Sequence, residues 1–416
     1  MSKIPNAPGL DSSLALVKDG YEFISKQCDR LQSDIFQTRL LFQKTICIRG
    51  AEAAKVFYDV DKFVRKGAAP KRVQKTLLGE GGVQSTDGEI HRHRKQMFMD
   101  LMSPERIEQL ANLVQQQWMK RAEAWENRDR IVLFDEANQV LCAAVCDWSG
   151  VPLSEADLSS KTQDLAAMID GSGAVGPRHW RGKAGRQRTE AWIRDVIDQV
   201  RSHQIEAPKE SALWAIAHHQ DLQGNLLDTQ IAAVDLLNVI RPTVAVARYV
   251  AFSALALHEH PDYQQKLKTG EDNDIKLFVQ EVRRFYPFFP FAAAMTQRSF
   301  DWQGYPFPPN TRVLLDLYGT NRDPQTWENP NLFQPERFRH WNKSPFNFIP
   351  QGGGDYIANH RCAGEWITIA LMITTLKFLT QSITYSVPQQ NLKVSLSRLP
   401  AIPKSRFVIS NVKRVT

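Results

Sequence analysis

The sequence predicts a mainly α (α+β) protein with a helical bulk and a small β-rich lobe. Helical periodicity dominates from about residue 104 to residue 285. Strand-like alternation is confined to short segments, such as 35–41 and 44–49 near the N-terminus and 300–317 further on. Because helical segments outnumber strand segments several-fold, we expect helices to form most of the core.

The elements at the two ends of the chain complete this picture. A helix is expected over 12–31 and another from Ala51 onward, and short strands are expected at 383–387 and 406–412. The chain has 416 residues, yet no linker rich in Pro, Gly or Ser divides it. We therefore expect one domain, residues 1–416.

The charge balance narrows the classes of partner. The chain carries 52 Lys and Arg residues against 45 Asp and Glu residues, a net charge of +7. The basic residues are interspersed with acidic ones and form no blocks, which argues against a nucleic-acid partner. An anionic substrate agrees with the same balance.

Cysteine usage and hydropathy bear on location. Five cysteines without a regular spacing favour a reducing compartment, and residues 1–16 lack the apolar core of a signal peptide. The most apolar stretch, 231–257, is interrupted by Asp235, Arg241 and Arg248, so we expect no membrane span. Together these features predict a cytoplasmic protein.

Cys362 differs from the other cysteines because it follows a glycine-rich loop and directly precedes a long apolar helix, expected over 365–380. A thiolate at a helix N-terminus is stabilised by the unpaired N–H groups there and can then ligate a metal. The ordinary alternative for a free cysteine is a buried structural thiol. We expect that role for Cys28, Cys47, Cys142 and Cys146, of which the last two lack a second pair to complete a metal site.

Three motifs occur in a characteristic order. The run His360-Arg361-Cys362-Ala363-Gly364 resembles the haem-thiolate loop of the cytochrome P-450 superfamily. Residues 281–284 (Glu-Val-Arg-Arg) resemble the Glu-x-x-Arg helix of that superfamily, and residues 335–338 resemble its Pro-Glu-Arg-Phe segment. The resemblance implies a cytochrome P-450-type fold in which Cys362 is the axial ligand of the haem iron.

The cysteine loop also departs from the usual pattern of the superfamily, which places Phe and Gly where this chain has Asp355 and Ala358. The glycines are displaced to 352–354. This longer loop resembles the fatty-acid peroxygenase branch, and the similarity extends over essentially the whole chain. The branch implies haem b as cofactor, hydrogen peroxide as oxidant, a long-chain fatty acid as substrate and no obligatory redox partner.

Haem carries two propionates, so a haem pocket needs cations. His91, Arg94 and Lys95 belong to a stretch that resembles the propionate-binding helix of the family, and His360 precedes the cysteine. We expect these four side chains to contact haem. The alternative for the first three is a solvated basic helix face.

Arg241 and Pro242 interrupt an apolar helix with a fixed cation and a residue that cannot donate to the carbonyl of Asn238. Oxygen-activating members of the family normally carry an acid followed by Thr at this point. Our hypothesis is that Arg241 holds the carboxylate of the substrate, and that this carboxylate performs the proton transfers that peroxide cleavage requires. The alternatives are a cation that reaches solvent and a structural ion pair, for which Asp235 is poorly placed on a regular helix.

The carbon that reacts depends on residues near the carboxylate. The run 77–98 looks most like that of an α-hydroxylating member, and relatives that form terminal alkenes tend to carry His where this chain has Gln84. We expect Leu78 and Gln84 to contact the substrate; the alternative is that both only pack the loop. Phe288 and Phe289 are further candidates for the channel of the tail, although aromatic runs are more often core.

Other functions stay open at this point. A fatty-acid decarboxylase that gives terminal alkenes, an oxygen-dependent monooxygenase that needs ferredoxin and a non-catalytic haem fatty-acid sensor share most of these features. The glycine motif at 171–176 fits the dinucleotide pattern but lies outside the expected strand-to-helix context, because the preceding residues read as helical. We expect a flexible loop over the substrate entrance instead.

Overall fold

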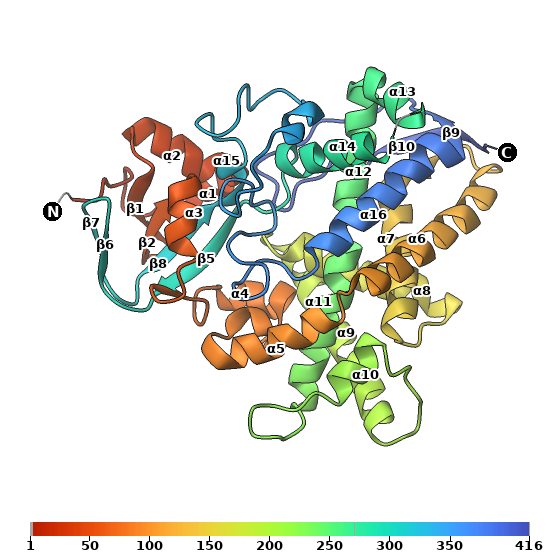
Figure 1. Ribbon diagram of the computed structural model, residues 1–416, viewed down its shortest axis with the longest axis horizontal. Coiled ribbons are helices and arrows are strands. Elements are labelled where there is room, and N and C mark those ends of the chain that lie inside the picture. The colour runs from red at the N-terminus through yellow and green to blue at the C-terminus, as the bar shows by residue number, and fades with distance from the viewer. Residues whose placement is uncertain (1–2, 270, 416) are drawn as a thin grey trace.

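The structure is a computed structural model that describes residues 3–269 and 271–415. Figure 1 shows a β-rich lobe near the N-terminus on the left and a larger helical bulk on the right. The largest apolar cluster occupies the helical bulk, and smaller clusters lie around the sheet of the lobe. The predicted fold class is confirmed.

The lobe is built around a five-stranded sheet of order β1-β2-β8-β5-β3. The strands β2 and β8 are parallel and the other pairs are antiparallel. The elements are α1 (Ser13–Asp19), α2 (Phe23–Leu31), β1 (Ile35–Leu40), β2 (Gln43–Ile48), α3 (Ala51–Phe57), β3 (Phe63–Val64), β5 (Phe291–Thr296) and β8 (Arg312–Asp316). The first strands and helices therefore lie where the sequence predicted them.

The helical bulk consists mainly of long helices, with a few short helical segments between them. Its elements are α4 (Lys71–Val73), a π-helical turn (Gln74–Leu78), a 3-10 turn (Val83–Ser85), α5 (Gly88–Asp100), α6 (Pro104–Trp125), α7 (Leu133–Ser149), α8 (Glu155–Gly171), α9 (Pro177–Arg201), α10 (Ala212–Ala217), α11 (Thr229–Ala245), α12 (Ala247–Glu259), α13 (Pro261–Thr269), α14 (Asp272–Phe285) and α16 (Glu365–Lys377). The short helix α15 (Leu317–Thr320) directly follows β8 and lies in the lobe (Figure 1).

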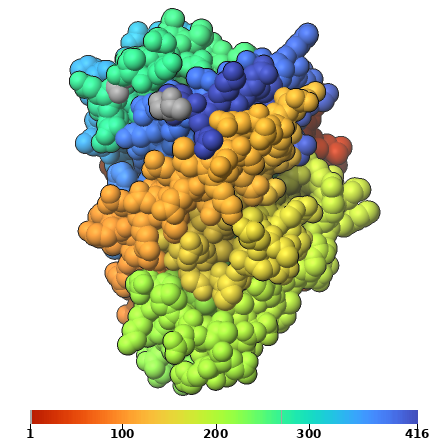
Figure 2. Space-filling model, turned by 90° about the vertical axis from the view of Figure 1, so that its right-hand side faces the viewer, coloured from red at the N-terminus to blue at the C-terminus, as the bar shows by residue number. Residues whose placement is uncertain are grey.

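Three short pairings complete the structure. β4 (Ile131–Val132), β10 (Val408–Arg414) and β9 (Ile383–Ser386) form a small sheet, and β6 (Phe300–Trp302) pairs with β7 (Tyr305–Phe307). Figure 2 shows α6 in orange crossing one face of the molecule beside the blue C-terminal segment.

The segment Thr229–Glu259 is long and apolar enough to span a membrane, but 94% of its most apolar window is buried inside the protein. It contains α11 and α12, which Figure 1 shows in green at the centre of the helical bulk. Its apolar character is therefore explained by packing in the core. Pro242 lies inside α11, which ends three residues later at Ala245.

The glycine motif at 171–176 lies between two helices. Gly171 ends α8 and Gly176 directly precedes α9, so no strand leads into the motif. This context excludes the dinucleotide interpretation. Gly182 and Gly185 on α9 instead allow close contact with α8, because an added Cβ at either position would lie 2.8 Å from a backbone carbonyl oxygen of α8.

Candidate active site

A cavity of about 360 Å³ lies between α11, α5 and the cysteine loop. Its lining brings together segments far apart in the sequence, from the loop at 77–84 to the start of α16. The sequence-predicted residues that line it are Leu78, Gln84, His91, Lys95, Arg241, Pro242, Phe288, Phe289, His360 and Cys362. Of the predicted site residues, only Arg94 is absent from this lining.

Cys362 lines the cavity directly before α16, whereas the other four cysteines are buried. Burial and the neighbouring Glu365 raise the pKa of the Cys362 thiol, against the lowering effect of the Gly364 N–H group, Lys95 and Arg283. The helix N-terminus contributes through the Gly364 N–H group, which lowers the pKa of the thiol. A metal cation bound by Cys362 would favour the thiolate further, because a coordinating thiol is deprotonated.

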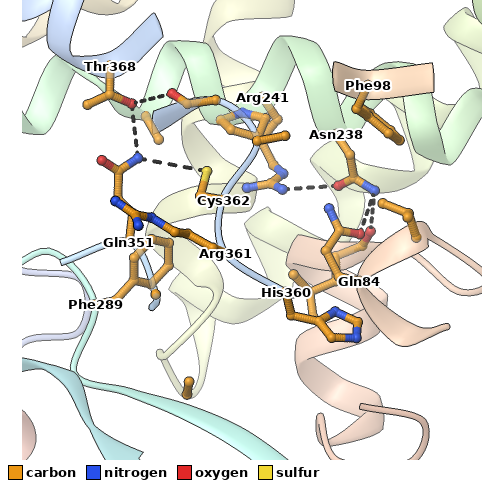
Figure 3. Close-up of a pocket in the computed structure, with 18 of the residues that line it drawn as sticks. Gln84, Phe98, Asn238, Arg241, Phe289, Gln351, His360, Arg361, Cys362 and Thr368 are labelled. Carbon is orange, nitrogen blue, oxygen red and sulfur yellow. Dashed lines mark hydrogen bonds between the residues drawn. The ribbon is translucent and has the colours of Figure 1, made fainter. Parts of the chain in front are cut away.

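Gln351 lies beside the thiol, a contact that sequence reasoning missed. Its Nε2 atom is 3.8 Å from Cys362 Sγ and donates to Thr368 Oγ1 at 3.0 Å, and Figure 3 shows both contacts. The Oε1 atom of Gln351 accepts from Arg283 at 3.1 Å, which fixes the orientation of the amide. Gln351 therefore presents an N–H donor toward the sulfur.

The basic side chains around the cavity suit a cofactor that carries two carboxylates. The His91 and His360 rings stack with centroids 3.8 Å apart, and His360 Nε2 lies 3.4 Å from Asp87. Burial lowers the pKa of His91 to about 3, of His360 to about 4 and of Lys95 to about 8. Carboxylates placed beside these groups would counter that effect, so the residues present fit the two haem propionates.

Two further arginines, Arg65 and Arg361, line the same cavity and were not singled out in the sequence. Arg65 is half-buried with its guanidinium 4.3 Å from the centroid of the Phe57 ring, and desolvation lowers its pKa. Its position depends on the fold of the lobe, which brings residue 65 to the cysteine loop. No local pattern around Arg65 indicated this.

Arg94 points away from the cavity. Its guanidinium forms a buried ion pair with the Asp235 carboxylate and donates to the Gly81 carbonyl at 2.7 Å. Asp235 is fully buried, so its carboxylate requires a cation, and Arg94 provides it. The expected contact between Arg94 and haem is therefore replaced by an ion pair that fastens α5 to α11.

Arg241 projects from α11 into the cavity and is 6% exposed. Its Nη2 atom donates to Asn238 Oδ1 at 3.1 Å, and no ion pair to Arg241 occurs among the described residues. Burial, and then repulsion by Arg186, lowers the pKa of Arg241 to about 9. Arg241 is thus a buried cation without a counter-ion in the described part of the chain, which is costly unless an anion binds there.

Asn238 connects Arg241 to the loop above it. Its Nδ2 atom donates to Gln84 Oε1 and to the Leu78 carbonyl, both at 3.1 Å (Figure 3). The three predicted residues Leu78, Gln84 and Arg241 are therefore linked through a side chain that the sequence did not single out. Asn238 lies three residues before Arg241, one turn earlier on α11.

The lining of the cavity contains no Asp and no Glu among the described residues. The aromatic wall consists of Phe288, whose ring stacks on Tyr249 with centroids 4.2 Å apart, and Phe289, which is 42% exposed. The cavity is therefore apolar with cationic groups, and its described lining offers no protein carboxylate for proton transfer.

The Glu-x-x-Arg and Pro-Glu-Arg-Phe motifs are joined to each other by buried ion pairs. Arg284 donates to both carboxylate oxygens of Glu281 at 2.7 Å, and the pair is fully buried. Arg337 of the Pro-Glu-Arg-Phe segment lies 3.3 Å from the same carboxylate. These residues are structural partners, away from the cavity.

Comparison with known proteins shows the family to which the chain belongs. The family model Cytochrome P-450 matches residues 275–407. A putative cytochrome P-450 120 from Synechocystis sp. is 23% identical over 94% of this chain and 92% of its own length. Among solved structures, a mutant of Cytochrome P450SP alpha (CYP152B1) is 46% identical, with a TM-score of 0.96 over 98% of this chain and 100% of that chain.

Two more solved structures match the full length. Cytochrome P450EX alpha (CYP152N1) with myristic acid is 45% identical, with a TM-score of 0.96 over 100% of both chains. A variant of cytochrome P-450 OleT in complex with arachidonic acid is 38% identical, with a TM-score of 0.97 over 100% of this chain and 99% of that chain. The chain therefore belongs to the cytochrome P-450 superfamily of haem-thiolate enzymes, in its fatty-acid peroxygenase branch.

Proposed function

We propose that the protein is a hydrogen-peroxide-dependent hydroxylase of long-chain fatty acids that acts mainly at the α carbon, with β hydroxylation as a minor outcome. One observation carries this proposal: Arg241 is a buried cation without a counter-ion among the described residues, in a cavity whose described lining holds no carboxylate. A fatty acid supplies the missing anion. Similar proteins were solved with myristic acid and with arachidonic acid, which supports a long-chain substrate.

Haem, held by Cys362 with His91, Lys95 and His360 toward its propionates, supplies the oxidising chemistry when it is bound. The carboxylate of the substrate, held by Arg241, would take a proton from the near oxygen of peroxide and return it to the far one. A carboxylate can perform both transfers in sequence. Arg241 is then the catalytic residue that imports this group, and Pro242 beside it leaves the Asn238 carbonyl without a main-chain donor within α11.

The head and the tail of the substrate have different roles. A charge-assisted hydrogen bond contributes about 1.5–3 kcal/mol, whereas each buried methylene contributes about 0.8 kcal/mol. A chain of ten or more methylenes therefore determines the affinity. Arg241 determines which carbon atoms of the substrate lie beside the reacting centre. Leu78 and Gln84 border the first carbons, and Phe288 and Phe289 border the tail.

The fixed head restricts the products. A carboxylate held beside the reacting centre presents only its α and β carbons, which excludes hydroxylation near the far end. Gln84 cannot supply a proton as an imidazolium can, so we assign hydroxylation ahead of decarboxylation to a terminal alkene. We further propose that the chain acts as one haem-thiolate domain in the cytoplasm, without an obligatory redox partner.

The test is incubation of the holoenzyme with hydrogen peroxide and myristate, followed by product analysis by mass spectrometry. The proposal predicts 2-hydroxymyristate without reductant or redox partners. Turnover only with reduced ferredoxin would identify an oxygen-dependent monooxygenase. Tight binding of myristate without any product would identify a sensor.

A further inference from the structure

A second cavity, of about 1150 Å³, lies apart from the haem cavity and shares no lining residue with it among the residues described. Its walls come from α7, α8 and α9, from Arg248 on α12, and from the loop at 393–406. Figure 1 shows α7 and α8 in the helical bulk, remote from the five-stranded sheet. Nothing in the proposed oxidation uses this cavity.

The walls of the second cavity are strongly basic. Eight of its lining residues are Arg or Lys and three are Asp, an excess of five positive charges. Two of the acids are paired separately, Asp135 with Arg406 and Asp164 with Arg188. The exposed cations Arg181, Lys393 and Lys404 form no ion pair within residues 3–269 and 271–415.

The third acid, Asp170, is shared by three arginines. Arg178 lies 3.0 Å from its carboxylate and Arg248 lies 3.4 Å from it, and Arg398 forms a third ion pair with the same group. Burial alone would raise the pKa of Asp170, yet the three cations bring it below its ordinary value. One negative charge therefore faces three positive charges, so the cluster carries an uncompensated positive charge.

Arg248 is the most buried of these cations, at 2% exposure. Its guanidinium lies 5.4 Å from the centroid of the Phe134 ring, and its buried Nε and Nη1 atoms have no hydrogen-bond partner among the described residues. One helical turn from Phe134, the Oδ1 atom of Asn138 is likewise buried without a partner in the described chain. Unsatisfied buried polar atoms of this kind are costly, so the cavity favours a polar occupant.

The chemistry of the walls selects the occupant. Guanidinium groups hold phosphate and carboxylate oxygens through paired N–H donors. Among the lining residues only Phe134, Ala166, Ala167 and Ile402 have apolar side chains, so the walls suit a charged ligand better than a long alkyl chain. Several positive charges in excess favour a multiply charged ligand, and the free oxygen of Asn138 favours a hydroxyl or amino group on its other end.

We propose that this cavity binds a small phosphate-bearing molecule that also carries hydroxyl groups, such as a nucleotide or a sugar phosphate. The phosphate lies among Arg178, Arg248 and Arg398, and the hydroxyl-bearing part lies toward Asn138. Arg181 and Lys404 at the rim attract the anion. This site is independent of the fatty-acid activity.

The test is isothermal titration calorimetry of the holoenzyme saturated with myristate, so that Arg241 is already occupied. The probes are ADP, pyrophosphate, inorganic phosphate and citrate, at constant ionic strength. The proposal predicts that ADP binds more tightly than both citrate and pyrophosphate, because the hydroxyl-bearing part adds contacts that neither of these anions can make.

Two variants locate the site. The double variant Arg181→Glu/Lys404→Glu changes exposed residues at the rim and should weaken ADP binding by about tenfold or more. The matched variant Lys44→Glu/Lys209→Glu makes the same change of charge at exposed positions elsewhere and should leave it unchanged. Arg248→Lys keeps the buried charge but loses the paired donors, and it should also weaken binding.

Three results would overturn the proposal. The absence of heat with every phosphate probe at millimolar concentration would mean that water fills the cavity. Equal affinity for ADP and for citrate or pyrophosphate would mean that charge alone is recognised. An equal loss of affinity in the two double variants would mean that the anion responds to net charge and binds elsewhere.

Discussion

Asn238 Oδ1 accepts a hydrogen bond from Arg241 Nη2 at 3.1 Å, while the Nδ2 atom of the same amide donates to Gln84 at 3.1 Å. The two contacts fix both ends of the amide, so the guanidinium is oriented by the loop at 78–84. The position of the substrate carboxylate therefore depends on Asn238, which carries no charge itself.

Arg241→Ala should abolish peroxide-driven oxidation of myristate, because both the counter-ion of the carboxylate and the imported proton carrier are lost. Arg241→Lys keeps a cation without the paired donors and should retain a small fraction of the activity. Product yield with saturating peroxide measures both. A near-normal yield from the Ala variant would refute the role of Arg241.

Asn238→Ala should raise KM for myristate about fivefold, which corresponds to the loss of about 1 kcal/mol from one hydrogen bond. It should also widen the distribution of products between α and β positions, because Arg241 becomes mobile. Asn238→Asp should lower the affinity further, since its carboxylate would neutralise Arg241. Unchanged KM and product ratio in Asn238→Ala would show that Arg241 holds its orientation unaided.

Gln84→His should divert part of the product toward the terminal alkene. An imidazole at this position lies within reach of Asn238 and can carry a proton that the amide of Gln84 cannot. Gln84→Asn, which also lacks a titratable proton, is the matched control. The assignment of regiochemistry to this position would fail if both variants gave the same products as the wild type.

Gln351→Leu should make the reduction potential of the haem iron more negative by about 40 mV, the equivalent of about 1 kcal/mol for one hydrogen bond in a one-electron couple. The amide N–H near Cys362 Sγ lowers the electron density on the sulfur. Thr368→Val keeps Gln351 and serves as the control. Spectroelectrochemical titration gives the reduction potential. Equal potentials in Gln351→Leu and Thr368→Val would contradict a hydrogen bond from Gln351 to the sulfur.

Asp316 contributes a pH dependence to stability. Burial raises the pKa of this carboxyl from 3.8 to about 6, so the folded state binds more protons than the unfolded state between these pH values. Its contribution is full below about pH 4 and is lost as pH rises through 6, a loss of about 3 kcal/mol. Denaturation at pH 4 and at pH 7 gives the free energy of unfolding of both proteins. Relative to the wild type, Asp316→Asn should be more stable at pH 7 than at pH 4.

The fold class and the residues with a distinctive local context were predictable from sequence. Cys362 follows a glycine-rich loop, and Arg241 lies in an apolar helix beside Pro242, so each departs from its surroundings. Asn238 and Gln351 show no such contrast. Their roles arise from contacts with residues 154 and 11 positions away, which only the tertiary structure reveals.

Arg94 shows why a basic stretch is a weak guide to individual contacts. His91 and Lys95 lie four residues apart on one face of α5 and line the cavity. Arg94 is turned to the neighbouring face, where the fully buried carboxylate of Asp235 demands a cation. The need for a cation here arises from the Asp235 carboxylate on α11, so the sequence of α5 alone does not predict the position of Arg94.

The most direct measurement supplies wild-type holoenzyme and hydrogen peroxide with a small oxidisable molecule that lacks a carboxylate, with and without a short carboxylic acid. If the carboxylate at Arg241 carries the protons, oxidation should require the short acid, and Arg241→Ala should not respond to it. Equal oxidation by the wild type with and without the acid would contradict the account.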